Sequence, residues 1–325
     1  MSRTCRMWLI LVAFLAACAW SAPAGAAYPT KPIEFIIPFG AGDSADIEGR
    51  LLAQEMTKAL GQPVVPINKE GGGGAITYTL VKNAKPDGYT VAWNSTSILT
   101  STNIGNVPFD HDAFDHIGRV EYQPMPFAVK ADAKWKTFKD FVEDCKKRPG
   151  VLKIANAGTG STTHIAAVAV MNAANCKVIH LPVGVKRRNA TVLSGETDAM
   201  FGPLTGIIKL AQAKQIRILT LPSQKRNQLI KDVPTATELG YPVVIDLFRG
   251  LSVPKGTPAE AKEKLYKAMV AAANSKALQD FSKKAGFTID TMDAKEFDPY
   301  LDKMDKLVKG ILKEAKLYRS KKPTQ

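Results

Sequence analysis

The chain has 325 residues, and its 44 lysines and arginines against 30 aspartates and glutamates give a formal net charge of +14. This length predicts two domains or one large domain with an ample core. The basic balance favours anionic ligands, and no nucleic-acid-binding motif accompanies it, which argues against the most common alternative partner of a basic protein.

The first 26 residues have the pattern of a secretory signal peptide. Arg3 and Arg6 precede an apolar run of about 14 residues, too short to span a bilayer, and residues 24–26 (Ala-Gly-Ala) form a cleavage site. Residues 15–18 (Leu-Ala-Ala-Cys) resemble a lipoprotein cleavage box, so acylation of Cys18 is the alternative. We expect an exported, periplasmic protein that is cleaved after residue 26.

Strand-like apolar runs alternate with helical patterns along most of the mature chain, which predicts parallel α/β layers. The expected strands are residues 33–38, 63–68, 89–94, 152–157, 177–182, 198–202 and 216–222. Helices are expected to begin near Ala45, Ala75, Thr137, Thr163, Lys186 and Thr205.

Two longer extended stretches, residues 116–133 and 241–256, interrupt this alternation. Each is too long for one ordinary strand and lacks helical periodicity, so we interpret them as crossovers between two lobes. We predict that lobe 1 comprises residues 27–120 and 250–325, and that lobe 2 comprises residues 121–249. The tail from Pro258 is expected to form a helical return to lobe 1.

Only two cysteines remain after processing. Cys145 falls near the end of an expected helix and Cys176 just before an expected strand, and in a βαβ layer both points lie at the same edge of the sheet. A Cys145–Cys176 disulfide is therefore expected in an oxidising compartment, with two free buried thiols as the alternative.

Two glycine-rich turns, residues 40–45 (Gly-Ala-Gly-Asp-Ser-Ala) and 157–163 (Ala-Gly-Thr-Gly-Ser-Thr-Thr), each lead from a strand into a helix. A helix N-terminus offers unpaired N–H groups and the positive end of its dipole, which favour a carboxylate or phosphate. One such turn in each lobe would let both face one ligand across a cleft.

Local patterns also allow other interpretations. Residues 40–45 match a dinucleotide pattern, but the expected second strand ends without the acid that binds a ribose. Residues 39–46 resemble an esterase block with Ser44 as nucleophile, yet none of the four histidines has an aspartate three residues before it. The cluster Asp110, His111, Asp112, Asp115 and His116 is more typical of a polar loop with capping acids than of a metal site.

Taken together, these motifs resemble the solute-binding proteins of tripartite tricarboxylate transporters. The resemblance covers nearly the whole mature chain and includes residues 28–56, 60–77, 84–93, 107–114, 154–167, 193–201, 216–221, 232–240 and 250–258. It implies a two-lobed α/β periplasmic binding protein of the type II, Venus-flytrap class, with a carboxylate bound between the lobes, no cofactor and no metal.

The resemblance also implies the ligand-binding residues. The first turn contributes Phe39, Gly40, Ala41, Gly42, Asp43, Ser44 and Asp46. The second turn contributes Ala157, Gly158, Thr159, Gly160, Ser161, Thr162, Thr163 and His164. The loop with Ser95, Ser97 and Asn103 is expected to line the same cleft. Asp46 is expected to fix its loop or cap its helix.

This chain departs from the family pattern in two places near the expected site. Asp43 brings an extra carboxylate to the first turn, where relatives have glycine. Arg187 and Arg188 follow the strand at residues 177–182, and either could grip a second carboxylate of the ligand. A solvent-exposed helix start is the alternative for each arginine.

We therefore expect a monomeric receptor that is not an enzyme. It would capture a di- or tricarboxylate or an aromatic acid, close by a hinge motion at the crossovers, and deliver the ligand to a membrane transporter. The alternative is a periplasmic hydrolase of carboxylate esters that uses Ser44, which would need a positioned base.

Overall fold

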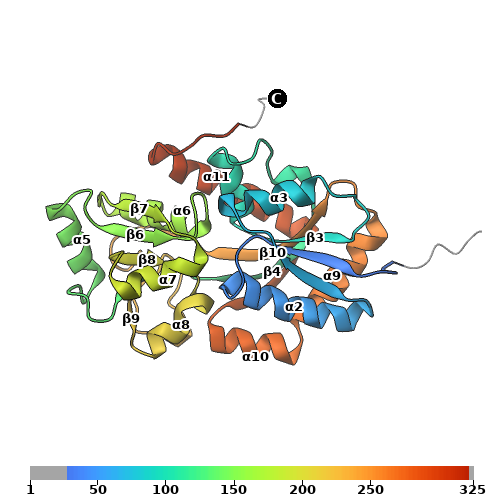
Figure 1. Cartoon of the computed structure of the whole chain (residues 1–325), viewed down its shortest axis with the longest axis horizontal. Helices are drawn as coiled ribbons and strands as arrows, with labels where there is room; N and C mark the ends of the chain where they lie inside the picture. Colours follow the sequence, from blue (N-terminus) through green and yellow to red (C-terminus); the bar gives the residue numbers. More distant parts are fainter. Residues whose placement is uncertain (1–27, 322–325) are drawn as a thin grey trace, which may run out of the picture.

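The computed structural model describes residues 28–321. The expected signal peptide, its cleavage site and Cys18 lie outside the described residues. Two lobes lie side by side, each built around its own sheet (Figure 1). Along residues 28–321 no helix combines the length and the apolar character needed to cross a bilayer.

The first lobe contains a mixed, six-stranded sheet in the order β11-β4-β10-β3-β1-β2. Its strands are β1 (Ile33–Ile37), β2 (Val64–Asn68), β3 (Thr90–Ser95), β4 (Phe114–Gln123), β10 (Leu247–Pro254) and β11 (Thr288–Asp293). Strand β1 pairs in parallel with β2 and β3, whereas β10 runs antiparallel to both β3 and β4. The helices are α2 (Ser44–Leu60), α3 (Ala75–Lys82), α4 (Ser97–Asn103), α9 (Ala259–Ala273), α10 (Lys276–Ala285) and α11 (Ala294–Glu314), with 3-10 turns η1 (Gly72–Gly74) and η2 (His111–Ala113).

The second lobe contains a five-stranded sheet in the order β7-β6-β8-β5-β9. Its strands are β5 (Phe127–Lys130), β6 (Lys153–Asn156), β7 (Ile179–Pro182), β8 (Ala199–Phe201) and β9 (Ile216–Thr220). Its helices are α5 (Phe138–Lys147), α6 (Thr162–Ala173), α7 (Val185–Ser194) and α8 (Leu204–Gln212), with the 3-10 turn η3 (Gln228–Ile230).

Residues on alternate faces of β1 show why its apolar run forms a central strand. Ile33, Phe35 and Ile37 pack into one hydrophobic cluster, and Ile36 packs into another on the opposite face. Both faces of a parallel sheet are covered by helices, so a nearly continuous apolar run is the expected pattern.

The two lobes are joined by more than the two extended stretches. Strand β4 leads directly towards β5, and β10 brings the chain back beside β4. Helix α11 begins in the first lobe, yet its residues Val308 and Leu312 are part of the hydrophobic core of the second. The fold class is therefore as expected, and the lobe boundaries near residues 120 and 249 stay a prediction.

Three local features differ from the expectations. Residues 97–103 form helix α4 rather than a loop. Strand β11 interrupts the tail that was expected to be wholly helical, because its partner β4 comes from far away in the sequence. Pro258 precedes α9 as its N-cap residue instead of opening the helix.

Cys145 and Cys176 are joined by a disulfide that links the end of α5 to the segment before β7. Closing a loop with a sequence separation of 31 residues contributes about 3.7 kcal/mol of stability on the chain-entropy model.

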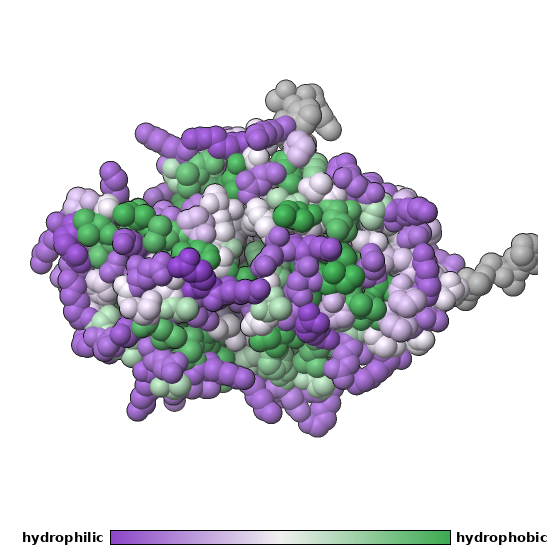
Figure 2. Space-filling model, viewed as in Figure 1, coloured by the Kyte–Doolittle hydropathy of each residue, from purple (hydrophilic) through white to green (hydrophobic). Residues whose placement is uncertain are grey.

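Figure 2 shows polar side chains around the outer rim of the molecule and paler residues along the line where the lobes meet.

Candidate functional site

The first glycine turn connects β1 to α2 and is held by the side chain of Asp46. Gly42 has a φ of 85°, a conformation that favours glycine, and its N–H donates to Asp46 Oδ2 at 2.9 Å. Asn68 and Arg50 also donate to this carboxylate. Burial raises the pKa of Asp46, but these hydrogen bonds and the charge of Arg50 outweigh burial and keep the pKa below its ordinary value. Asp46 therefore fixes the turn.

The second glycine turn connects β6 to α6 and uses most of its own polar groups internally. Ser161 Oγ caps α6 by accepting from the His164 N–H, and Thr163 Oγ1 accepts from the Ala157 N–H at 2.8 Å. The Gly160 N–H donates to His164 Nδ1 at 3.3 Å. Burial, together with the nearby His180, lowers the pKa of His164 to about 4, so its ring is neutral at pH 7.

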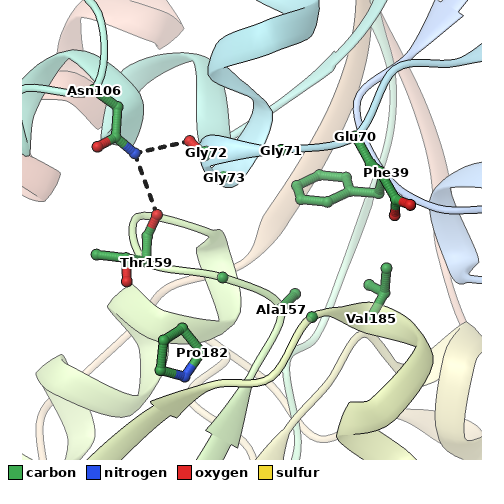
Figure 3. A pocket seen from close by; sticks show the side chains of 12 residues that line it. Phe39, Glu70, Gly71, Gly72, Gly73, Asn106, Ala157, Thr159, Pro182 and Val185 are labelled. Atoms are coloured by element: carbon green, nitrogen blue, oxygen red, sulfur yellow. Dashed lines mark hydrogen bonds between the residues drawn. The ribbon is translucent and has the colours of Figure 1, made fainter.

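The second turn lies directly against another glycine-rich segment of the first lobe, residues 71–74 (Figure 3). A Cβ at Gly73 would lie 2.7 Å from the carbonyl oxygen of Thr159, so only glycine allows this approach. Asn106 Nδ2 donates to the carbonyl oxygens of Gly72 at 2.8 Å and Thr159 at 3.3 Å, which ties the lobes together. The structure thus has the cleft in a closed arrangement.

A small cavity of about 20 Å³, here called the inner cavity, lies between the two turns. It is lined by Phe39, Asp43, Ala157, Ser161, Thr162, Thr163, Arg188, Pro203, Leu247 and Arg249. Arg188 is 0% exposed and Arg249 is 1% exposed, so two buried arginine side chains line one small space. Arg188 Nη2 lies 3.2 Å from Asp43 Oδ1, which links α7 to the first turn.

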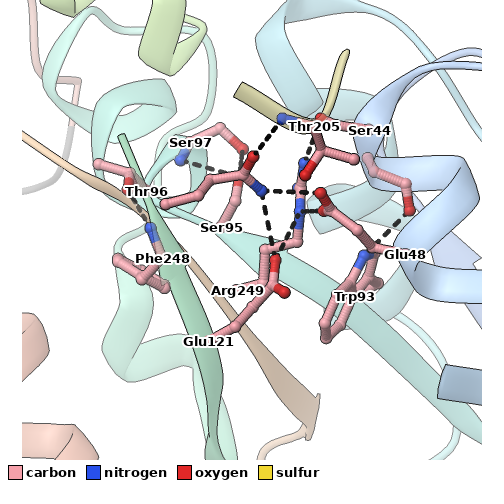
Figure 4. Close-up of polar contacts among 12 residues, drawn as sticks. Ser44, Glu48, Trp93, Ser95, Thr96, Ser97, Glu121, Thr205, Phe248 and Arg249 are labelled. Carbon is pink, nitrogen blue, oxygen red and sulfur yellow. Dashed lines mark hydrogen bonds and ion pairs between the residues drawn. The ribbon is translucent and has the colours of Figure 1, made fainter. Parts of the chain in front are cut away.

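Arg249 is held by a buried polar network (Figure 4). Its Nε donates to Glu48, and its Nη2 donates to Ser44 Oγ at 2.9 Å. Glu121 lies 3.7 Å from the same Nε. Burial and the charge of the adjacent Glu48 raise the pKa of Glu121 well above its ordinary value and favour its protonated form. Gln123 donates to Glu48 at 2.8 Å and completes the network.

Three buried polar atoms at the inner cavity have no hydrogen-bond partner among residues 28–321. They are Arg188 Nη1, Arg249 Nη1 and Thr162 Oγ1, and Thr162 is 2% exposed. Leaving a buried polar group unpaired costs about 1–3 kcal/mol, and more when the group is charged. The cavity therefore offers donors from both lobes to an acceptor, and a carboxylate is the acceptor that guanidinium groups bind best.

A second space, here called the outer pocket, has a volume of about 390 Å³ and opens beside the inner cavity. Phe39 and Ala157 line both spaces, so they adjoin. The outer pocket is also lined by Glu70, Gly71, Gly72, Gly73, Asn106, Gly158, Thr159, Pro182, Gly184 and Val185. Figure 3 shows the Phe39 ring and Glu70 on one wall, with Ala157, Pro182 and Val185 on the facing wall.

Not every residue expected in the site lines one of these spaces. Seven residues of the two turns line neither space, namely Gly40, Ala41, Gly42, Ser44, Asp46, Gly160 and His164, and four other expected residues have contacts elsewhere. Ser95 and Ser97 are buried and bond to each other, and Asn103 donates to the Leu99 carbonyl and to Asp305. None of these three lines either space. Arg187 points away and pairs with Glu196 at 3.0 Å on the surface.

The His/Asp cluster of residues 110–116 is engaged in local contacts. Asp110 caps η2 by accepting from the Asp112 N–H, and Asp115 pairs with Lys262 at 3.0 Å. The ring nitrogens of His111 lie 3.7 Å from Asp112 and 3.5 Å from Asp302. Buried His116 bonds to Ser252 and to the His111 carbonyl, and burial and the adjacent His111 lower its pKa to about 3.

Sequence reasoning missed Arg249, Glu48, Glu121 and Glu70. One signal was available for Arg249, since it is a charged residue inside the apolar run Leu-Phe-Arg-Gly-Leu-Ser-Val-Pro that forms β10. A charge within a fully buried strand indicates a paired or ligand-binding group. Glu48 and Glu70 follow ordinary helix and loop patterns, so no local signal marked them.

Comparison with known proteins gives one consistent result. A family model described as the tripartite tricarboxylate transporter family receptor matches residues 49–317. A UPF0065 protein of Pseudomonas sp. is 30% identical over 246 residues, which cover 74% of this chain and 73% of that protein.

Solved structures agree with this match. The structure of the periplasmic binding protein BugD superposes with a TM-score of 0.85 at 26% identity, covering 90% of this chain and 99% of that chain. The structure of MatC from Rhodopseudomonas palustris with bound malate superposes with a TM-score of 0.84 at 21% identity, covering 88% and 100%. At that identity, the likeness to MatC establishes the fold only.

Proposed function

The chain belongs to the tripartite tricarboxylate transporter receptor family, and from this premise we propose that it is a periplasmic receptor for a small organic carboxylate. The ligand would be a di- or tricarboxylate or an aromatic acid, held between the lobes and delivered to a membrane transporter of the tripartite type. The receptor would act as a monomer. The malate bound to MatC, a protein of the same fold, supports a carboxylate as the ligand class.

One observation carries the proposal. Arg188, Arg249 and Thr162 line one cavity between the two glycine turns, and each has a buried polar atom without a hydrogen-bond partner among residues 28–321. A carboxylate supplies two oxygens with several lone pairs, so a single ligand group can accept from donors of both lobes. Binding would then give these buried, unpartnered atoms charge-assisted hydrogen bonds, which offset the cost of removing them from water.

The same contacts support ligand-dependent closure. Arg188 and Thr162 belong to the second lobe, and Arg249 lies on β10 at the end of the first. A ligand that bridges these donors binds the closed arrangement more tightly than an open one, and this difference shifts the equilibrium towards closure. Opening would be a hinge motion at the crossovers. This motion would also have to preserve or rearrange the contacts that α11 makes with the hydrophobic core of the second lobe.

The hydrogen bonding of Ser44 fits a receptor better than it fits a hydrolase with Ser44 as nucleophile. Ser44 Oγ accepts from Arg249 Nη2, and among the described residues no histidine or carboxylate is its hydrogen-bond partner. A serine nucleophile needs an adjacent base to remove its proton. Here the hydroxyl instead orients a guanidinium group.

Isothermal titration of the mature protein, residues 27–325, against mono-, di-, tri- and aromatic carboxylates tests the proposal. Arg188→Gln should weaken binding of the best carboxylate at least tenfold. Arg187→Gln is the matched control, because this neighbouring arginine pairs with Glu196 on the surface, and its affinity should stay within twofold of the wild type. Failure of every carboxylate to bind, with binding of an uncharged sugar, would overturn the proposal.

A further inference from the structure

The outer pocket differs in charge from the inner cavity that it adjoins. Its lining residues are glycine backbone, aliphatic and aromatic side chains, Thr159 and Asn106, and Glu70 is the only one that ionises. Neither guanidinium group of the inner cavity is among them. The two arginines that line the combined space therefore lie at one end of it.

Glu70 also pairs with a lysine of the second lobe. Lys186 Nζ lies 4.0 Å from Glu70 Oε1, so their charges compensate each other at the mouth of the pocket. Glu70 Oε2 lies close to Gly40, where an added Cβ would come within 2.5 Å of it. A second carboxylate placed in the outer pocket would meet a like charge and no free side-chain cation among the residues that line it.

Two donors of the pocket are already used. Asn106 Nδ2 donates to Gly72 and Thr159, and the Gly158 N–H donates to Asn156 Oδ1 at 3.0 Å. The side chains of Phe39, Val185, Pro182 and Ala157 form apolar walls of the pocket. Such surfaces favour an apolar or aromatic group, and the ring of Phe39 can pack against another ring.

We infer that the ligand is a monocarboxylate with an uncharged, largely apolar tail, such as an aromatic acid. Its single carboxylate binds Arg188, Arg249 and Thr162 in the inner cavity, and its tail fills the outer pocket. Glu70 excludes ligands with a second acid at the far end. This inference rests on the proposed function, since it narrows the ligand class of the same site.

Three compounds with one skeleton test the inference by isothermal titration of the mature protein. They are phenylacetate, 4-carbamoylphenylacetate and 4-carboxyphenylacetate, which differ only at the end away from the first carboxylate. The first two should bind with affinities within fivefold of each other, and the dicarboxylate should bind at least tenfold more weakly. Malate and succinate should also bind more weakly than phenylacetate.

The variant Glu70→Gln removes the proposed exclusion. It frees Lys186 and should reduce the preference for the amide over the dicarboxylate to less than threefold. Glu196→Gln is the control, because Glu196 is an exposed glutamate that pairs with Arg187 away from the pocket, and it should leave the preference unchanged.

The outcomes separate the two proposals. Equal or tighter binding of the dicarboxylates, or an unchanged preference in Glu70→Gln, would overturn the inference and leave the carboxylate receptor intact. Binding of no carboxylate at all would overturn the proposed function itself, and the inference with it.

Discussion

The carboxylate of Asp43 lies 3.2 Å from the guanidinium of Arg188, although the two residues are 145 positions apart in the chain. Asp43 belongs to the first glycine turn and Arg188 to helix α7 of the second lobe. This ion pair crosses the cleft at the cavity where the ligand carboxylate is proposed to bind. Asp43 therefore partly neutralises the arginine that the ligand would use.

Asp43→Asn should lower the stability of the unliganded protein and raise its affinity for a carboxylate. The substitution leaves the buried charge of Arg188 without its acidic partner, so the thermal midpoint without ligand should fall. A bound carboxylate would then supply the missing charge, and affinity should rise about tenfold, or roughly 1.4 kcal/mol. Thermal denaturation and titration of both proteins measure the two effects, and a loss of affinity in Asp43→Asn would contradict this account.

Thr162 and Ser161 are neighbours with different roles, and their variants should behave differently. Thr162→Val removes an unpartnered hydroxyl at constant shape, so stability should be unchanged or higher while affinity falls about fivefold, near 1 kcal/mol. Ser161→Ala removes the α6 cap and should cost about 1 kcal/mol of stability. Urea denaturation with parallel titration distinguishes them, and unaltered affinity in Thr162→Val would remove Thr162 from the site.

The two glutamates beside Arg249 should respond unequally to the same substitution. Glu121→Gln replaces an acid whose pKa is raised by burial and by Glu48, so the free energy of unfolding should change by less than about 0.5 kcal/mol. Glu48→Gln leaves the buried charge of Arg249 without its hydrogen-bonded counter-ion and should cost about 3 kcal/mol. Urea denaturation at pH 7 tests the pair, and equal losses would show that Glu121 is also charged.

Acidification should destabilise the protein through His164. Its pKa is lowered from 6.5 to about 4 in the fold, so the unfolded chain binds the extra proton first. The stability due to the neutral ring is complete above pH 6.5 and is lost as pH falls towards 4, by roughly 3 kcal/mol.

His164→Asn should make the stability profile between pH 6.5 and 4 shallower than that of the wild type. Subtracting the two profiles removes the contribution of His116, whose pKa is lowered in both proteins, and leaves that of His164 together with its interaction with His180. Parallel profiles would show that the ring is not held neutral in the second turn.

Much of the fold follows from patterns that occupy short windows of sequence. The run at residues 33–37 alternates between two helix-covered faces, and the turn after it contains Gly42, which adopts the positive φ that the turn requires. The role of Asp46 was likewise accessible, since its carboxylate contacts the N–H of a residue only four positions earlier. Strand β11 was missed because its pairing with β4 is not local.

The amino-acid sequence by itself determined the alternation of strands and helices, the two glycine turns and the family resemblance, because each depends on residues close together in the chain. Only the tertiary structure decided that Arg188 rather than Arg187 faces the cleft, since one residue along a helix rotates a side chain by about 100°. It also decided that Arg249 and Arg188 line one cavity and that Glu70 lines the adjoining outer pocket. Those placements depend on how two lobes pack together, and such packing brings together residues that no local pattern connects.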